Sequence, residues 1–589
     1  MKILLLHPED SPRHGKWSGC QWDLIVDLGK SAASTASAWQ SELHCPVLRL
    51  ESFRQGSKDL AAVREILQMG RARLLDREGL DWWELTAILM HAELETVFLL
   101  RRVVRELAGT NELWSSRNGW PISAMAVILG RKVRSFDDTA GFRARRRLNH
   151  YRGVLRNLSI SQLNEIFLDK YDARYRWRNI FARRKVPVCA PLVLLPTAYT
   201  NVSRMAAAYA SMLPEQQFLL VATRNSGLLF DAPANVHVAP LASYADGTES
   251  REECADILEN WQTLQRDMGR IPEIDLLHRV GRLNRFPHLF RQGLATRNAW
   301  RTVLESERVR AVLCGDDSNP FTRLPVLLAK KRGLPTLDFH HGALDGRFLI
   351  KDLPSDLYLA KSQMERDYLQ RVCGLEPERV VLGAPTPVVS VTSDPAASQA
   401  RSQIVFFSEP YESSGGRAEE VYRELLPSLA RLAAENGRKL IIKLHPFESV
   451  RERSRLIGRV LSIEDQQNLE ICSGPLSRDL LLQTWFGITI ESSTVLDCAL
   501  QGIPCFLCEW LVLNAYEYVQ QYGRFGVGYT LNAPAQISEI PCVLAMPGTT
   551  LQSRKSTWEP LEPETLRGYL EAKSDAVAAH KNVVPEACA

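Results

Sequence analysis

Short apolar runs alternate along this chain with longer segments of helical periodicity, and this rhythm constrains the fold more than any other feature of the sequence. Runs such as Lys2–Leu6, Gln403–Phe407 and Lys439–Lys443 have the length and composition of buried strands. Strands that alternate with helices build parallel sheets whose faces are covered by those helices. The sequence therefore predicts the α/β fold class, with Rossmann-like units.

The chain is long enough for several domains. Its 589 residues exceed what one hydrophobic core organises, since a domain usually holds about 100 to 200 residues. Changes of composition predict an N-terminal α/β accessory domain, a basic helical connector, two further Rossmann-like domains and a C-terminal helical tail that packs back on its neighbour. In chain order these segments are 1–137, 138–186, 187–385, 400–545 and 546–589.

Composition narrows the partners and the compartment. The formal net charge of +4 is small for this length, so no chain-wide attraction to nucleic acid is expected. The twelve cysteines are scattered, mostly in apolar stretches, as is usual for reduced cysteines of the cytosol. The apolar run at the N-terminus is too short for a signal peptide, and no stretch reaches the roughly 20 apolar residues of a transmembrane helix. These features predict a cytoplasmic protein.

The predicted connector is the most basic part of the chain. Arginines are dense between Arg143 and Lys185, with aromatic residues among them. Basic segments of this kind are attracted to anionic lipid headgroups. We therefore expect peripheral contact with the inner face of an anionic membrane. A solvated helix face without a partner is the alternative interpretation.

Two loops of the second domain carry candidate catalytic residues. Open α/β sheets bind ligands at the carboxyl ends of their strands. Asp316 and Asp317 follow the predicted strand AVLC, where a neighbouring charge and partial burial suit a general base. Capping of the next helix is the alternative role for this loop. His341, in HHG after another strand, can contact a phosphate or take a proton from an acceptor, or it can lie at the surface of a tight turn.

The third domain carries candidate nucleotide-binding residues in two of its loops. Lys443, His445 and Pro446 follow the strand KLIIK, and the proline restrains the backbone just past the histidine. A buried structural histidine is the alternative. Ser408 and Glu409 follow the first strand of this domain, at the start of a loop suited to the nucleotide.

A second strand-to-helix junction of the third domain has three hydroxyl side chains, on Ser492, Ser493 and Thr494. Hydroxyls and free backbone N–H groups at a helix N-terminus form a phosphate site. Plain capping of the helix is the alternative role.

Taken together, these motifs resemble those of bacterial GT-B glycosyltransferases that use cytidine nucleotides, such as sialyltransferases, polysialyltransferases and Kdo transferases. Such enzymes carry an Asp/Glu-Asp/Glu-Gly motif, then His-Pro, then Ser-Ser/Thr, and the resemblance covers roughly residues 187–545. The matching residues are Asp316-Asp317, His445-Pro446 and Ser492-Ser493. One departure is Ser318, which stands where the family has glycine and leaves the identity of the catalytic carboxylate open.

The resemblance implies two facing Rossmann-like domains, with the acceptor bound by 187–385 and the nucleotide sugar by 400–545. It further implies a CMP-activated ulosonic acid of the sialic-acid or Kdo type as donor, and a surface glycan or lipid-linked glycan as acceptor. The implied mechanism is direct displacement with Asp317, or Asp316, as the base and with no metal or other cofactor. His445 and the two serines would stabilise the departing phosphate.

Other assignments stay open. Teichoic-acid-type glycerophosphotransferases also resemble this chain, through His341-Gly342, His445-Pro446 and Ser492-Ser493 with Asp497, and the Asp-Asp pair favours the sugar transferase over them. A UDP-sugar GT-B transferase, a GT-B epimerase and a non-catalytic carbohydrate-binding protein are further alternatives. The sequence has no P-loop, no G-x-G-x-x-G after a strand and no Asp-x-Asp, so NTPase, dinucleotide-oxidoreductase and GT-A assignments have no support.

Overall fold

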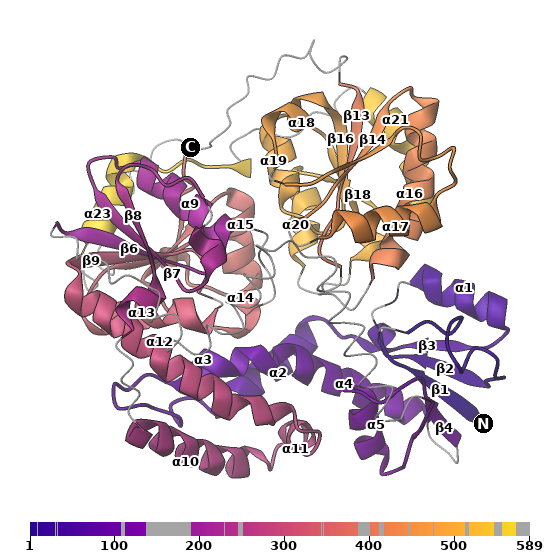
Figure 1. The fold of residues 1–589 in the computed structure, drawn as a ribbon, viewed down its shortest axis with the longest axis horizontal. Helices are drawn as coiled ribbons and strands as arrows, with labels where there is room; N and C mark the ends of the chain where they lie inside the picture. The colour runs from indigo at the N-terminus through magenta and orange to yellow at the C-terminus, as the bar shows by residue number, and fades with distance from the viewer. Residues whose placement is uncertain are drawn as a thin grey trace.

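The computed structural model contains three α/β units, which Figure 1 shows at lower right, at left and at upper right in chain order. It describes residues 1–136, 190–386 and 401–572, apart from gaps at 9, 30, 32, 108–111, 229, 246–250, 318, 343, 345–346, 412–416, 446–447, 475, 513–516 and 547–556. Within this part of the chain the units hold parallel sheets of five, seven and six strands. The predicted α/β fold class is confirmed.

The first unit has the strand order β3-β2-β1-β4-β5. Its first strand is buried at four successive positions, as expected for a strand covered on both faces. The strands are β1 Lys2–Leu6, β2 Leu24–Asp27, β3 Val47–Arg49, β4 Glu112–Ser115 and β5 Arg134–Ser135, and the helices are α1 Ala33–Leu43, α2 Ser57–Met69, α3 Trp82–Ala87, α4 His91–Glu106 and α5 Ile122–Leu129, with the 3-10 helix η2 Ile88–Met90.

The second unit has the order β12-β11-β10-β9-β6-β7-β8, and the described residues between β8 and β9 include three inserted α-helices. The strands are β6 Leu192–Thr197, β7 Gln217–Ala222, β8 Val236–Pro240, β9 Val309–Cys314, β10 Thr336–Asp338, β11 Leu357–Ala360 and β12 Val380–Leu382. The helices are α9 Thr200–Ser211, the inserted α10 Arg251–Met268, α11 Pro272–Arg279 and α12 Phe286–Ser306, and then α13 Pro320–Lys331, α14 Arg347–Ile350 and α15 Gln363–Asp367.

The third unit has the order β15-β14-β13-β16-β17-β18. Its strands are β13 Gln403–Phe407, β14 Lys439–Lys443, β15 Leu469–Cys472, β16 Thr484–Thr489, β17 Cys505–Cys508 and β18 Tyr529–Leu531. Its helices are α16 Ala418–Glu435, α17 Val450–Val460, α18 Arg478–Gln483, α19 Thr494–Leu500, α20 Tyr518–Arg524 and α21 Ile540–Ala545. Loops that follow strands of the second and third sheets line one cavity, so these two Rossmann-like units face each other, which is the GT-B arrangement.

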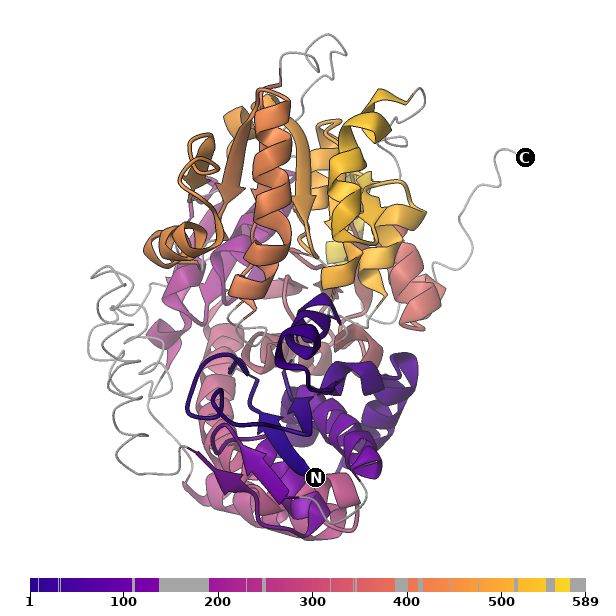
Figure 2. The same ribbon diagram turned by 90° about the vertical axis from the view of Figure 1, so that its right-hand side faces the viewer.

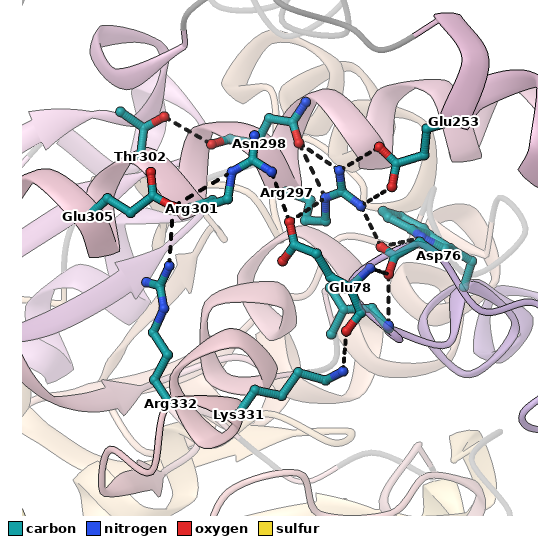
Figure 3. Close-up of polar contacts among 12 residues, drawn as sticks. Asp76, Glu78, Glu253, Arg297, Asn298, Arg301, Thr302, Glu305, Lys331 and Arg332 are labelled. Atoms are coloured by element: carbon teal, nitrogen blue, oxygen red, sulfur yellow. Dashed lines mark hydrogen bonds and ion pairs between the residues drawn. The ribbon is translucent and has the colours of Figure 1, made fainter.

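The first unit, which the sequence analysis predicts as an accessory domain, is packed into the second unit. Arg297 of α12 is 1% exposed, and its guanidinium reaches Asp76 of the first unit at 2.7 Å and Glu253 of α10 at 2.6 Å. Figure 3 shows this network between the two units. Beside it, a Cβ atom on Gly293 would come within 2.0 Å of the Trp82 ring. One continuous core therefore contains residues of both units.

The third unit touches both others. Thr35 of the first unit donates a hydrogen bond of 3.0 Å to Glu420 of α16, and Figure 2 shows the first unit in front of the second, below the third. After the third sheet the chain returns to the second unit, where α23 Pro563–Glu571 buries Leu566 and Leu570 in the core of that sheet. This helix lies within the segment 546–589 for which the sequence analysis predicts a C-terminal tail. The predicted basic connector 138–186 and residues beyond 572 lie outside the described residues.

Candidate functional site

A cavity of about 1120 Å³ lies between the facing sheets. It opens where the strand order reverses, beside β6 and β9 in the second sheet and beside β13 and β16 in the third, as ligand sites of open α/β sheets do. Nine of the residues predicted from the sequence line it: Asp316, His341, Ser408, Glu409, Lys443, His445, Ser492, Ser493 and Thr494. Pro446 lies outside the described residues. Trp82, Thr86 and Leu89 of the first unit also line the cavity.

The two adjacent aspartates after β9 have different surroundings. Asp316 lines the cavity, whereas Asp317 is 2% exposed and does not. The cap of the following helix α13 is Asn319, whose side chain accepts a hydrogen bond of 3.0 Å from the backbone N–H of Phe321. Asn319 therefore fills the N-cap position, and of the two carboxylates Asp316 is the one placed to meet a substrate.

Asp317 belongs to a buried ion network that joins the first and second units. Its carboxylate pairs with Lys351 and lies 3.3 Å from Arg323, which also reaches Glu84 of the first unit at 2.6 Å. Burial opposes ionisation, but Lys351 and Arg323 outweigh it and lower the pKa of Asp317. The prediction of Asp317 as general base is therefore revised, because its charge is held by these cations behind the cavity wall.

A second carboxyl, Asp338, shares this network. Burial, and then the nearby charge of Asp317, raise the pKa of Asp338 well above its ordinary value. Two adjacent buried carboxylates do not both ionise, so the directions of the two pKa shifts favour an ionised Asp317 next to a protonated Asp338.

A buried lysine holds the HHG turn after β10 in place through hydrogen bonds to its backbone. Lys361 donates to the backbone oxygens of His340 at 2.7 Å and of Gly342 at 3.0 Å. The two imidazole rings lie 4.8 Å apart, and both histidines line the cavity. A Cβ atom on Gly342 would lie 3.9 Å from the Oγ of Ser493, so this turn approaches the third unit closely.

The loop after β14 is organised by Glu448, a residue that the sequence analysis did not single out. Its carboxylate accepts hydrogen bonds from the backbone N–H of His445 at 2.7 Å and from Ser408 and Arg453 at 2.8 and 2.7 Å. The Ser408 hydroxyl is thus used to hold the loop. Burial, and then the charge of Lys443, lower the pKa of His445, so the imidazole is neutral near pH 7.

Lys443 itself is tied to the protein backbone. Its ammonium donates to the carbonyls of Leu444 at 2.9 Å and of Gly474 at 2.6 Å, and burial lowers its pKa. At the junction after β16, the Oγ of Ser492 accepts from the backbone N–H and the hydroxyl of Thr494 at 3.3 and 3.1 Å. Ser493 is the cap residue of α19, and its side chain makes no capping hydrogen bond. Helix capping therefore accounts for part of the role of the Ser492 side chain and does not account for that of Ser493.

Two carboxyls on the wall of the third unit titrate near neutral pH. Burial, and then the charge of Glu491, raise the pKa of Glu409 to about 7, although it accepts hydrogen bonds from Thr489 at 3.0 Å and from the Glu491 N–H at 2.8 Å. Asp497 lines the cavity with an exposed side chain. The walls of the cavity partly exclude solvent from its carboxyl, and this desolvation raises its pKa to about 6, with Lys361 opposing. In the described part of the chain no three His, Cys, Asp or Glu side chains are grouped as metal ligands.

These titrations predict pH-dependent binding of a phosphate group. Glu409 and Asp497 become ionised between about pH 5.5 and about pH 8, which adds negative charge to the cavity. We expect the affinity for the methyl ester of CMP, whose charge is constant over this range, to fall about threefold to tenfold as the pH rises. Calorimetry at both pH values measures this. Protonation of His445 at low pH acts in the same direction, so Glu409→Gln is the informative variant: it should reduce the pH dependence, and an unchanged dependence would exclude Glu409 as its cause.

The sequence analysis missed the side chains after β6 and β7. Tyr199, Arg204 and Arg224 line the cavity, and the signal was the same as at the other loops, namely their position after an apolar strand. The wall made by Trp82, Thr86 and Leu89 gave no sequence signal, since it depends on how the first unit packs.

Among the described residues, no helix is both long enough and apolar enough to span a membrane.

No protein-family model and no curated protein matches this sequence, whereas several solved structures are similar at low identity. A putative UDP-N-acetylglucosamine 2-epimerase from Listeria monocytogenes is 10% identical, with a TM-score of 0.43, over 68% of this chain and 100% of that chain. For the calicheamicin glycosyltransferase CalG4 the values are 13%, 0.37, 68% and 100%. For the wall teichoic acid polymerase TagF they are 11%, 0.34, 74% and 96%. TM-scores this low carry no argument about function.

Proposed function

We propose that this chain is a GT-B glycosyltransferase that transfers a sugar from a nucleotide-activated donor to an acceptor hydroxyl. One observation carries the proposal: a single cavity at the switch points of two facing sheets has Asp316 and His341 on one wall and His445, Ser492 and Ser493 on the other. The first pair supplies acid–base chemistry, and the second set supplies hydrogen-bond donors for a phosphate.

The proposed donor is a CMP-activated ulosonic acid of the sialic-acid or Kdo type. The third unit offers the phosphate the hydroxyl pair of Ser492 and Ser493 next to His445. The amine of Lys443 is held by the backbone carbonyls of Leu444 and Gly474. This compact set suits a single phosphate next to the nucleoside better than a diphosphate. A surface glycan or a lipid-linked glycan is the proposed acceptor, and docking on an anionic membrane through Arg143–Lys185 stays a prediction.

The proposed reaction is a direct displacement. Asp316 removes the proton from the acceptor hydroxyl, and the oxygen attacks the anomeric carbon of the sugar. The bond between that carbon and the phosphate oxygen breaks, and the nucleotide leaves with the electron pair. Ser492 and Ser493 donate hydrogen bonds to the phosphate as this charge develops, while the proton stays on Asp316.

Calorimetry with CMP, UMP and UDP tests the donor assignment. We expect CMP to bind most tightly, and we expect Ser492→Ala with Ser493→Ala to weaken CMP by about 1 to 3 kcal/mol through lost charge-assisted hydrogen bonds. His445→Ala should have a comparable effect. UDP binding about tenfold tighter than CMP, a difference of about 1.4 kcal/mol, would replace the CMP-sugar assignment with the UDP-sugar alternative.

Glycerophosphotransfer from a CDP-glycerol donor is the second candidate function. Asp497 favours it, since this residue completes the pattern of the glycerophosphotransferases and lines the cavity together with His341 and Ser493. Incubation with labelled donors separates the candidates. Transfer of glycerol phosphate supports this second function, and isomerisation of a UDP-sugar without an acceptor supports an epimerase instead.

A further inference from the structure

Two arginines of the second unit face the cavity without a carboxylate partner in the described part of the chain. Arg204, on the first turns of α9, is exposed, and Arg224, after β7, is half-buried. Both line the cavity. The guanidinium of Arg224 lies over the ring of Tyr199, 4.9 Å from its centroid. Neither arginine contributes to the network that joins the units, so their charges are available to a ligand.

The loops that carry these side chains are fixed to each other by hydrogen bonds. Thr200 Oγ1 donates to the carbonyl of Ser226 at 2.6 Å, and Ser226 Oγ donates to the carbonyl of Ala198 at 3.0 Å. The backbone N–H of Thr223 donates to the carbonyl of Thr197 at 2.8 Å. The ends of β6 and β7 therefore hold Tyr199 and Arg224 side by side, which lowers the entropic cost of ordering them around a ligand.

The two arginines lie apart from the carboxylates of the cavity, whose other lysine and arginine, Lys443 and Arg478, belong to the third unit. The carboxylates Asp316, Glu409, Glu491 and Asp497 follow β9, β13 and β16 or lie on α19. The two arginines follow β6 and β7, on the other side of the switch point of the second sheet. In addition, no side chain caps the N-terminus of α9 at Tyr199, so its backbone N–H groups add positive potential at the same corner.

We infer that the corner formed by Tyr199, Arg204 and Arg224 binds a carboxylate or phosphate group of the acceptor. This inference rests on the proposed function, because the nucleotide is assigned there to the third unit and the second unit is left to the acceptor. Planar guanidinium groups pair with both kinds of anion through two parallel hydrogen bonds. The acceptor would thus be an acidic glycan, if the group is a carboxylate, or a phosphorylated or lipid-phosphate-linked glycan, if it is a phosphate.

Calorimetry with three probes of similar size tests this subsite in the full chain saturated with CMP. The probes are glucuronate, glucose 6-phosphate and neutral glucose. We expect at least one of the anions to bind at least about tenfold more tightly than glucose, and its affinity to fall as ionic strength rises. The better anion tells a carboxylate acceptor from a phosphate acceptor. The double variant Arg204→Ala with Arg224→Ala should lose this preference.

The control variant is Arg431→Ala, because Arg431 is an exposed arginine of α16 outside the cavity lining. It should keep the wild-type preference. Glucose binding as tightly as both anions, or a preference that survives in the double variant, would overturn the subsite. CMP affinity separates this test from that of the proposed function: in the double variant it should stay within about twofold of wild type. Loss of CMP affinity there would reassign the arginines to the donor, whereas anion binding by a wild-type protein that does not bind CMP would support the subsite and contradict the proposed donor.

Discussion

The Asp316→Asn variant should lose turnover by about a hundredfold or more while CMP binds within about twofold of wild type. Asparagine keeps the size of the side chain and removes the group that accepts the proton from the acceptor. CMP affinity should be kept because the proposed nucleotide contacts come from the third unit, across the cavity. Single-turnover transfer from a labelled donor, together with calorimetry of CMP, measures both quantities.

The neighbouring variant Asp317→Asn is the matched control, since it makes the same chemical change one residue along. It should fold, because Asp338 can release its proton and take over the pairing with Lys351. Its stability should fall, but the folded protein should keep turnover within about tenfold of wild type. A loss of turnover in Asp317→Asn that equals or exceeds that in Asp316→Asn would restore Asp317 as the base. Near-normal turnover of both variants would move that role to His341.

The sequence predicts the positions of the site loops well, because each follows an apolar strand and the carboxyl ends of parallel strands meet at one edge. It does not decide between Asp316 and Asp317. Successive side chains at a strand end point to opposite sides, so of two neighbouring residues one can face the cavity while the other faces the core. The decision depends on Arg323, in the helix that follows, and on Lys351 and Glu84, which come from more distant parts of the chain, and these three residues show no shared pattern in the sequence.

The role of the first unit is hidden from the sequence for the same reason. Periodicity shows that α3 and α12 each have an apolar face, but it does not show that these faces meet. The ring of Trp82 packs against Gly293, and the sequence gives no sign of a contact between residues so far apart in the chain. A wall of the cavity therefore comes from a segment that composition alone describes as an accessory domain.

The Arg297→Met variant should lower the free energy of unfolding by about 3 to 5 kcal/mol, because it leaves two buried carboxylates without their cation. The side chains of Arg297 and Asp76 are 2% and 0% exposed, and that of Glu253 is 7% exposed. Guanidinium unfolding followed by tryptophan fluorescence measures the loss. Trp82, Trp83, Trp261 and Trp300 all lie in the core shared by the first two units, so the signal reports on this junction.

The pH dependence of the loss identifies its cause. In the wild-type protein the hydrogen bonds from Arg297 lower the pKa of Glu253. The pair therefore contributes to the free energy of unfolding down to acidic pH. Without Arg297 the buried carboxyls bind protons on folding, so the variant should become more stable relative to wild type as the pH falls from about 8 to about 5.5. The matched control is Arg301→Met, four residues along α12, whose side chain is 35% exposed and pairs with Glu78 at 3.0 Å. It should cost no more than about 1 kcal/mol. Equal losses in the two variants, or a loss in Arg297→Met that does not depend on pH, would mean that packing rather than this buried network joins the first unit to the second.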